Sequence, residues 1–370
     1  MAIRIVFCGG GTGGHLFPII AVAREIKKLS PVTHGEIPQM LFVGPYTVGE
    51  EVIEQEGIIK KTIMAGKLRR YISGHNLLDI FRLFIGFFQA LGILFSYMPN
   101  VVFAKGGFGS VPVVLAAWLY RIPVLIHESD SHAGLANRFL SRFSKRIAIS
   151  FKGAAAFFPA KKTALLGNPI RAEILNGTKE QAKILFQLNG QKPLLLILGG
   201  SQGAKSINDI VFIALAGLAQ VCEIIHQCGE ENYQELKALL GPKTPADYHL
   251  YPFLKEDQMK NALAAADLIV SRAGAGSIFE IAASGKPSVL IPLPDSAADH
   301  QNLNAYEYAK TGATLVVDQA NLTPNFLKDR IFSLLENPEL LSQMCLAAKS
   351  FARPDADKQI AQEILNIAKI

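Results

Sequence analysis

Short apolar runs alternate with longer helical stretches along the whole chain, and the series occurs twice. The first series predicts five β-strands, at 3–7, 40–44, 101–104, 123–128 and 146–150. The second predicts five more, at 193–199, 223–228, 267–272, 288–293 and 314–317. Apolar strands that alternate with helices are typical of parallel sheets covered on both faces. Two such series predict an α/β protein made of two doubly wound, Rossmann-like domains.

The start of each series has the same order of strand, glycine loop and helix. IRIVFCGGGTGGH at 3–15 corresponds in this way to PLLLILGGSQGAK at 193–205. Helices are expected to follow at 16–29 and 204–220.

The boundary between the two domains is expected near LLGNPIR, at 165–171, where Gly, Asn and Pro interrupt any regular element. We therefore expect an N-terminal domain at 1–168 and a C-terminal domain at 169–354. The tail at 355–370 is predicted to form a final helix that packs back on the N-terminal domain, with three isoleucines on one face.

One apolar stretch, residues 77–98, requires comparison with a membrane-spanning helix. Asp79 and Arg82 interrupt its start, and the clean run from Leu83 to Met98 has 16 residues. A bilayer span needs roughly 20. We interpret the stretch as an amphipathic or buried helix.

Composition and charge limit the class of protein and of partner. The 370 residues are 50% hydrophobic and 18% charged, which excludes disordered and fibrous proteins. Residues 1–168 contain 19 lysines and arginines against 9 acidic residues, whereas residues 169–370 contain 18 against 22. The first half thus has a balance of +10 and the second −4, so an anionic partner is expected: nucleic acid, phosphates or a membrane surface.

The cysteines and the N-terminus indicate a cytosolic chain. The 4 cysteines lie far apart and form no C-x-x-C pair, which argues against a zinc site or a disulfide framework. The first apolar run leads directly into glycines, as a strand does and a signal peptide does not.

Four glycine-rich loops each follow a predicted strand, at 9–14, 106–110, 199–204 and 272–277. The first lacks the acidic residue that a dinucleotide site needs about 20 positions on. The third lacks the G-K-[S/T] spacing of a Walker loop. Backbone amides and helix N-termini at these loops are suited to bind phosphates, although a tight turn is the plainer alternative.

Two residues beside these loops have candidate roles. His15 is expected at a helix N-terminus, where the helix dipole disfavours its protonated form, so it is a candidate general base. Glu280 lies one turn into the helix after the fourth loop, where it could accept hydrogen bonds from ribose hydroxyls. Its alternative role is a carboxylate favoured by the helix dipole.

Two polar clusters follow strands as well. The first, HESDSHAGLAN at 127–137, could be a catalytic or sugar-binding loop, a structural turn or a metal site, although it has no helical H-x-x-x-H spacing. The second cluster lies in 292–305 and is either presented to a ligand or is a solvated turn. It contains Asp299, His300, Gln301 and Asn302.

Together these motifs resemble the MurG family. GGGTGGH, GGFGS, HESD with GLAN, GNPIR, GGSQGA, RAGAGSIFE and DHQNLNA occur in the family's order from residue 3 to beyond residue 305. The family is the UDP-N-acetylglucosamine transferase of peptidoglycan synthesis, which converts lipid I to lipid II. The resemblance implies the GT-B fold, in which two Rossmann-like domains face a cleft.

The resemblance also implies roles for individual residues. His15 is the first candidate base. This chain has Asp130 where some members have an asparagine, which makes Asp130 a rival base because an ionised carboxylate accepts protons but donates none. Leu254 matches a position whose backbone contacts uracil. The donor site would comprise Thr12, Gly13, Gly14, Arg171, Ser201, Leu254, Ala275, Gly276, Ser277, Ile278, Phe279, Glu280 and Gln301. The acceptor diphosphate would lie against Gly11, Gly106 and Gly107.

The implied reaction is an inverting transfer to the C4 hydroxyl of a muramyl sugar, with no cofactor and no metal. The helix N-terminus after 272–277, Ser201 and Arg171 would supply positive potential to the leaving UDP. The expected partners are UDP-N-acetylglucosamine, lipid I and an anionic membrane surface. Lys67, Arg69, Arg70 and the helix near 77–98 would dock peripherally on the cytoplasmic side of the cell membrane.

Three alternatives remain at this point. A UDP-N-acetylglucosamine 2-epimerase or another GT-B transferase would keep the fold and change the reaction. A non-catalytic sugar-nucleotide-binding subunit would need a partner. Nucleic acid is not expected as a partner, since no aromatic and basic interleaving or known module occurs.

Overall fold

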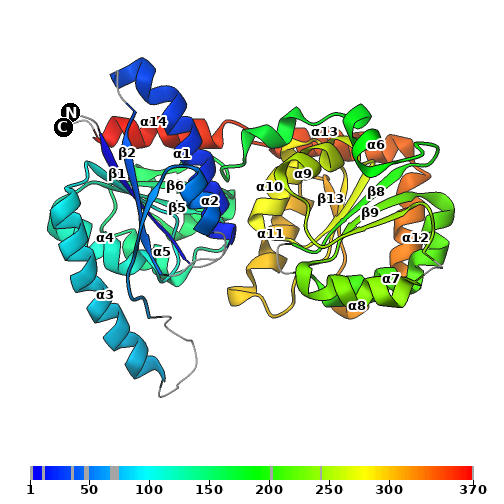
Figure 1. The fold of residues 1–370 in the computed structure, drawn as a ribbon, viewed down its shortest axis with the longest axis horizontal. Helices are drawn as coiled ribbons and strands as arrows, with labels where there is room; N and C mark the ends of the chain where they lie inside the picture. The colour runs from blue at the N-terminus through cyan, green and yellow to red at the C-terminus, as the bar shows by residue number, and fades with distance from the viewer. Residues whose placement is uncertain are drawn as a thin grey trace. The chain divides into compact units, whose positions relative to one another are not determined.

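The computed structural model divides the chain into two compact units (Figure 1). One comprises Met1–Arg171 together with Pro354–Ile370, and the other comprises Ala172–Arg353. The structure describes residues 3–10, 13–34, 37–45, 50–66, 75–200, 203–241 and 244–368.

The N-terminal unit is built on a seven-stranded sheet in which every paired strand is parallel. The order is β3-β2-β1-β4-β5-β6-β7. The strands are β1 (Arg4–Cys8), β2 (Gln39–Gly44), β3 (Ile59–Thr62), β4 (Val101–Ala104), β5 (Val124–Glu128), β6 (Arg146–Ile149) and β7 (Thr163–Leu165). The helices are α1 (Gly13–His34), α2 (Glu50–Gln55), α3 (His75–Tyr97), α4 (Ser110–Leu119), α5 (Leu135–Leu140) and α14 (Ala356–Ala368).

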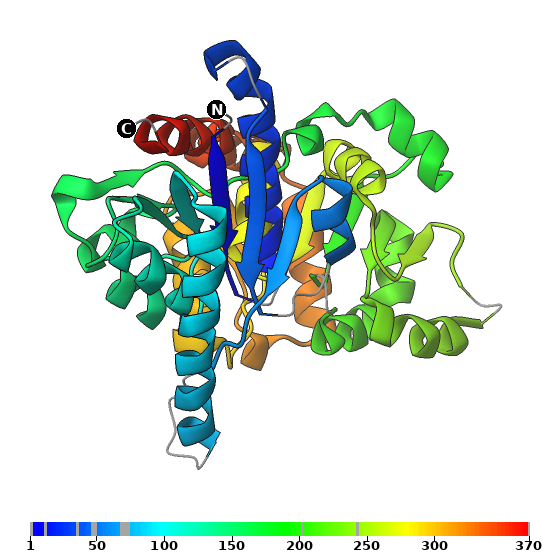
Figure 2. The same cartoon turned by 60° about the vertical axis from the view of Figure 1, so that its left-hand side comes forward.

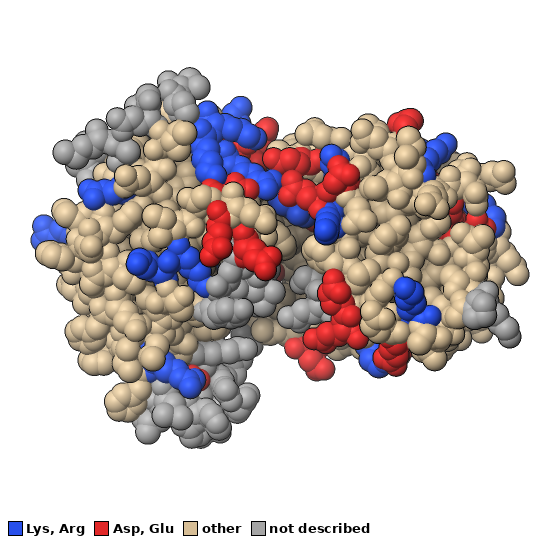
Figure 3. Space-filling model, viewed as in Figure 1, with Lys and Arg blue, Asp and Glu red and all other residues tan. Residues whose placement is uncertain are grey.

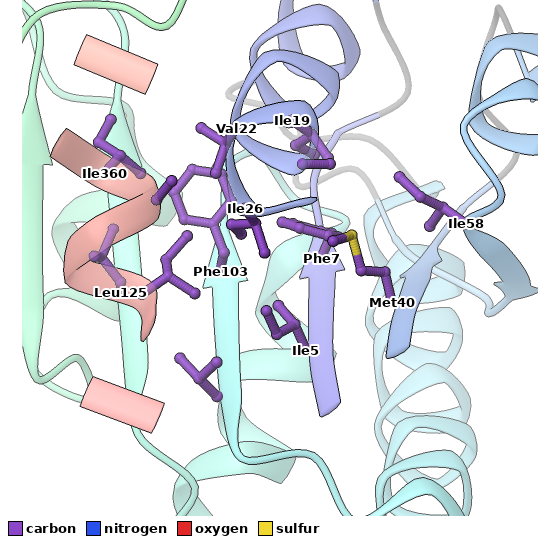
Figure 4. Close-up of a cluster of buried hydrophobic side chains, with 14 of the residues drawn as sticks. Ile5, Phe7, Ile19, Val22, Ile26, Met40, Ile58, Phe103, Leu125 and Ile360 are labelled. Atoms are coloured by element: carbon purple, nitrogen blue, oxygen red, sulfur yellow. The ribbon is translucent and has the colours of Figure 1, made fainter. Parts of the chain in front are cut away.

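Alternate residues of β1 enter two different cores, because successive side chains of a strand point to opposite faces. Ile5 and Phe7 pack beneath α1 and α14, where Ile360 also lies (Figure 4). Val6 and Cys8 pack on the other face, in the core that α3 and α4 cover. Both faces of the sheet are therefore dry, which explains why its central strands are apolar without alternation.

Helix α14 joins this unit although it is the end of the chain. Its isoleucines at 360, 364 and 367 are at most 4% exposed and belong to the core under α1. The chain therefore leaves the N-terminal unit after Arg171 and returns to it at Pro354.

The C-terminal unit has a six-stranded sheet, again with parallel pairing throughout. The order is β10-β9-β8-β11-β12-β13. The strands are β8 (Leu194–Leu198), β9 (Glu223–Gln227), β10 (Tyr248–Tyr251), β11 (Leu268–Ser271), β12 (Ser288–Leu290) and β13 (Thr314–Val316). The helices are α6 (Lys179–Phe186), α7 (Lys205–Val221), α8 (Glu230–Leu240), α9 (Glu256–Ala265), α10 (Ala275–Ala283), α11 (His300–Ala309), α12 (Pro324–Leu335) and α13 (Pro338–Phe351).

Both sheets confirm the doubly wound architecture predicted from the sequence. In each, the third, second and first strands are followed by the fourth, fifth and sixth. The chain direction of the crossovers reverses between the first and fourth strands, and ligands of open α/β sheets bind beside the carboxyl ends at that switch point. The loops after β1 and β4 in one unit, and after β8 and β11 in the other, are therefore the expected ligand-binding loops.

Ten of the observed strands lie where the apolar runs predicted them, and three others were not predicted. The three are β3, β7 and β10, with sequences IKKT, TAL and YHLY. All three lie at a sheet edge, where one side of the strand meets solvent and a continuous apolar run is not needed.

Helix α3 differs from the other helices of its unit in length and exposure. Its 23 residues span about 35 Å at 1.5 Å per residue, and Figure 2 shows it extending beyond the ends of the strands. One face, with Ala90 and Leu94, is buried in the core that includes α4 residues. The opposite face exposes six large apolar side chains: Ile80, Phe81, Phe84, Ile85, Phe88 and Phe95.

By length and composition, one helix in the described part of the chain could cross a membrane, namely α3 over Asp79–Tyr97. Its apolar face is continuous with few charges, and the surface over α3 in Figure 3 is mostly free of acidic and basic residues. The sequence left open whether this helix is amphipathic or buried, and the structure shows the amphipathic arrangement.

Candidate functional site

In the N-terminal unit, the loops after β1 and β4 meet around His15, in the first turn of α1. A Cβ atom added at Gly10 would lie 2.9 Å from Cδ2 of His15. One added at Gly107 would lie 3.1 Å from Cα of Gly10 and 3.5 Å from Cε1 of His15. The two glycines thus let both backbones approach a half-buried imidazole. The structure brings together His15, Gly106 and Gly107, which the sequence analysis had assigned to base and acceptor.

Gly106 also has a conformation that requires glycine. Its φ is +90°, and a Cβ atom there would lie 2.6 Å from Nδ2 of Asn137. The Asn137 amide in turn donates to the His127 carbonyl at 3.1 Å and to Oε2 of Glu128 at 3.0 Å. The loop after β4 therefore rests directly on the polar cluster that follows β5.

At the centre of this cluster is a lysine that the sequence analysis passed over. Lys105, 1% exposed, has its Nζ 2.7 Å from Nδ1 of His127 and 3.3 Å from Oδ1 of Asn168, and it also donates to Oγ of Ser129. Burial lowers the pKa of Lys105 to about 7, opposed by the negative charges of Glu128 and Asp130.

His127 is fixed by this contact and is not a candidate proton acceptor. Its Nδ1 accepts from Lys105, so its proton is on Nε2, which donates to the Gly167 carbonyl at 3.0 Å. Burial, followed by the Lys105 charge, holds the pKa of His127 well below its ordinary value. The ring is neutral, and both of its nitrogens are hydrogen-bonded within the protein.

Both carboxylate oxygens of Glu128 are also hydrogen-bonded within the protein. Its oxygens accept from the amides of Asp130 at 3.1 Å and Gly134 at 3.0 Å, in addition to Asn137. Burial, and next the Asp130 charge, raise the pKa of Glu128. These bonds shape the turn that presents Asp130, which is half-buried at the carboxyl end of β5.

The same cluster does not have the form of a metal site. His132 turns away to pack edge-on against Phe157, with ring centroids 4.4 Å apart. Among the residues that the structure describes, no group of three or more His, Cys, Asp or Glu side chains is arranged to hold a metal ion.

Arg171 closes the N-terminal unit and lies beside α1. Its guanidinium carbon is 4.9 Å from the centroid of the Phe17 ring, a cation–π contact. Phe17 and His15 both lie in the first turns of α1. Arg171, the arginine expected at the donor, therefore packs against the helix that contains the candidate base.

In the C-terminal unit, the glycine loop after β8 is held by the end of β9. Gln227, 2% exposed, donates from Nε2 to the Gly200 carbonyl at 3.0 Å, and its Oε1 accepts from the Leu254 amide at 3.1 Å. One side chain thus joins the loop expected at the diphosphate to the segment expected at uracil. The Leu254 amide thus donates within the protein, and the other backbone group of this residue is its carbonyl oxygen, a hydrogen-bond acceptor.

The loop after β11 is organised by Arg272. Its Nη1 donates to the carbonyls of Ile291 and Pro292, each at 3.1 Å. Its Nη2 donates to Oγ of Ser206 at 2.8 Å and to Oε1 of Gln319 at 2.7 Å. The guanidinium therefore ties together the loops after β11, β12 and β13 and the start of α7.

The expected nucleotide-binding segment Ala275–Glu280 is the first part of α10. Gly274 precedes the helix in extended conformation, with φ −66° and ψ 141°, and its carbonyl accepts from the Ile278 amide at 3.0 Å. Ile278 and Phe279 are buried and anchor the helix, whereas Gly276, Ser277 and Glu280 are only partly buried. The N-terminus of α10 lies at the switch point, where its amides and dipole favour an anion.

Gln301 lies at the start of α11, beyond β12. Its side-chain Oε1 accepts from the backbone amide of Leu293 at 3.0 Å. Its backbone amide donates to Oγ of Ser296 at 3.1 Å. The side-chain Nε2 is then the group that can donate to a sugar hydroxyl. Asp299, beside it, has φ +58° and accepts from Nδ2 of Asn302 at 2.6 Å, so this polar cluster is an ordered turn.

Some of the candidate residues lie outside the described part of the chain. They are Gly11, Thr12 and Ser201 of the loops, and Lys67, Arg69 and Arg70 before α3.

Three functional candidates were missed from the sequence: Lys105, Gln227 and Arg272. Each directly follows or ends a strand at its carboxyl end. Arg272 also begins the fourth glycine loop and Lys105 directly precedes the second, so their positions were visible in the sequence but their roles were not. Their partners lie far along the chain, up to 66 residues away for Arg272.

Comparisons with known proteins agree with both halves of this description. The family model "Glycosyltransferase family 28 N-terminal domain" matches residues 5–149, and "Glycosyltransferase family 28 C-terminal domain" matches residues 194–360.

Relatives of similar length are named UDP-N-acetylglucosamine–N-acetylmuramyl-(pentapeptide) pyrophosphoryl-undecaprenol N-acetylglucosamine transferase. The protein from Caldanaerobacter subterraneus is 37% identical, covering 99% of this chain and 100% of its own. The one from Acetivibrio thermocellus is 36% identical and covers 99% of each.

Solved structures give the same result. The crystal structure of MurG from Acinetobacter baumannii has a TM-score of 0.75 and 30% identity, over 98% of this chain and 99% of that one. The UDP-GlcNAc 2-epimerase from Neisseria meningitidis has a TM-score of 0.69 at 15% identity, over 99% and 100%, which shows a shared fold alone. These likenesses confirm the predicted GT-B class.

Proposed function

This chain belongs to glycosyltransferase family 28, and from that premise we propose that it makes lipid II. It would move N-acetylglucosamine from UDP-N-acetylglucosamine to the C4 hydroxyl of the muramyl sugar of lipid I, in peptidoglycan synthesis. The observation that carries the proposal is the full-length similarity, at 36–37% identity, to transferases that bear this activity in their names.

The donor is assigned to the C-terminal unit. The N-terminus of α10 and the glycine loop after β8 would bind the diphosphate, and both lie at the switch point of that sheet. Glu280 would accept hydrogen bonds from the ribose, the Leu254 carbonyl would bind uracil, and Gln301 Nε2 would donate to the sugar. Gln227 and Arg272 would hold these groups in place.

The acceptor and the proton transfer are assigned to the N-terminal unit. Inversion in a single displacement requires a base at the C4 hydroxyl and stabilisation of the departing UDP. His15 is the proposed base, because it lies at a helix N-terminus between two glycine loops whose amides suit a diphosphate. Asp130 is the second candidate. Positive potential on the leaving group would come from the α10 dipole and Arg171.

The exposed face of α3 is assigned to the membrane. An acceptor with a polyprenyl chain is held in a bilayer, and α3 extends beyond the strands on the side of their carboxyl ends, the side on which the acceptor loops follow β1 and β4 (Figure 2). Its row of exposed phenylalanines and isoleucines would enter the interface, so the protein would bind peripherally to the cytoplasmic leaflet.

The direct test is UDP release and lipid II formation by the purified protein, with and without lipid I or a soluble analogue. The proposal expects product only when the acceptor is present. The shared fold makes 2-epimerisation the rival reaction, and that reaction needs no acceptor: it would convert the donor to UDP-N-acetylmannosamine or, with water, to N-acetylmannosamine and UDP together. Formation of either epimer without acceptor, and no lipid II with it, would therefore overturn the proposed transfer.

A further inference from the structure

Lys105 lies where three loops of the N-terminal unit meet. It follows β4, while its partners come from β5 (His127), from the residue after β5 (Ser129) and from the loop after β7 (Asn168). An ammonium group has three protons, and here each has an acceptor. One buried charge therefore joins the carboxyl ends of three strands.

Two of these loops, those after β4 and β5, carry groups of the acceptor side of the proposed site. Gly106 and Gly107 follow the lysine directly, and Gly107 lies against Gly10 and the His15 ring. Asp130 follows Ser129. A shift of the Lys105 side chain would therefore move the surroundings of both candidate bases.

A buried ammonium is costly, so its presence at this point requires an explanation other than packing. Moving the charge of a lysine out of water is unfavourable unless partners compensate. The charges that face it are Glu128 and Asp130, which favour its protonated form, while His127 is neutral and accepts from it. His15, on α1, is the next titratable group: a charge on its ring would lower the pKa of His127 further. From the loop after β7, the neutral Asn168 faces the lysine.

We propose that Lys105 is a positioning residue of the transfer reaction, and that its ammonium form holds the acceptor-side loops in their working arrangement. The inference rests on the proposed function. The neutral amine has two protons for the same three acceptors, so loss of the third proton releases a loop contact.

The test compares the wild type with Lys105→Met and with the control Lys286→Met. Lys286 is also a partly buried lysine with a lowered pKa, but it donates to the Ala264 carbonyl in the C-terminal unit. In Lys105→Met, kcat/KM for the acceptor should fall on the order of 10–100-fold, whereas the Kd for UDP should not change. Lys286→Met should change neither.

The pH profile separates positioning from support of the fold. Burial lowers the pKa of Lys105 to about 7 in the folded state from an ordinary value near 10.5. Above pH 7 the unfolded chain therefore binds the proton more tightly, and the stability contribution of Lys105 rises with pH. Activity should move the other way: it should fall above about pH 7 in the wild type, and this decline should be absent from Lys105→Met and retained in Lys286→Met.

Three results decide the matter. If the activity of Lys105→Met only follows its folded fraction and its pH profile matches the wild type, the inference is overturned. If the wild type transfers nothing to lipid I, the proposed function fails instead. If Lys105→Met does not fold, Ser129→Ala removes one acceptor and keeps the charge; it should lower acceptor kcat/KM several-fold, and an unchanged value would again overturn the inference.

Discussion

The exposed face of α3 gives the sharpest prediction about how the protein reaches a lipid acceptor. The perturbation is the pair Phe84→Ser and Phe88→Ser. These rings stack edge-on with centroids 4.8 Å apart and are 61% and 55% exposed. At about 200 Å² per side chain the two rings also bury on the order of 170 Å², worth at most about 4 kcal/mol of folding free energy, so the folded fraction of the variant is measured before its binding is compared.

The magnitude follows from the exposed area. A phenylalanine side chain has about 200 Å², so the two rings expose on the order of 230 Å² together. At about 25 cal/mol per Å², complete transfer of that area into hydrocarbon contributes about 6 kcal/mol. Insertion to half depth at the interface contributes about 3 kcal/mol, so the double variant should bind vesicles on the order of 100-fold more weakly.

Co-sedimentation with sucrose-loaded vesicles measures the membrane affinity of the wild type and the variant. Vesicles of anionic lipid and vesicles of neutral lipid are both used. The matched control is the pair Ile184→Ser and Ile213→Ser, whose side chains are 81% and 68% exposed on α6 and α7 of the other unit. The control should bind as the wild type does. Transfer to a soluble lipid I analogue should be unchanged in both variants.

Equal binding of the phenylalanine variant and the wild type would refute the reasoning, as would a wild type that binds neither kind of vesicle. Alkaline carbonate extraction distinguishes peripheral binding through α3 from a membrane span formed by this helix. A peripheral protein is released by carbonate, whereas a protein that spans the bilayer through α3 stays with the membrane.

Three further predictions concern the two units separately. His15→Ala should lower turnover on the order of 10²–10⁴-fold with the Kd for UDP unchanged; near-normal turnover would transfer the role of base to Asp130. Gln227→Leu removes the bonds to Gly200 and Leu254, so calorimetry should find the Kd for UDP raised on the order of 10-fold, and an unchanged Kd would contradict the assigned clamp. Burial raises the pKa of Asp357 to about 6 from an ordinary 3.8, so stability falls as pH rises between these values. Asp357→Asn should therefore gain on the order of 1–2 kcal/mol in urea unfolding at pH 7.5, with little gain at pH 4.

The sequence determined the repeated features of both units. Central strands such as IRIVF and LLLIL are apolar throughout because both faces of their sheets are covered, and that requirement is written in consecutive residues. The glycine loops follow the same strands at once, so strand order was enough to predict that His15 and Ala275–Glu280 lie at carboxyl edges. The motifs in order also indicated the family.

Tertiary structure alone decided which side chains hold those loops. Lys105 meets Asn168 across 63 residues of sequence, and Arg272 meets Ser206 across 66. Such contacts depend on which strands become neighbours, which no local pattern records. The edge strands β3, β7 and β10 escaped prediction because a strand half in solvent needs no apolar run. The run at 77–98 fixed a helix, but whether its apolar residues met a core or faced outward depended on α4 covering only one side of it.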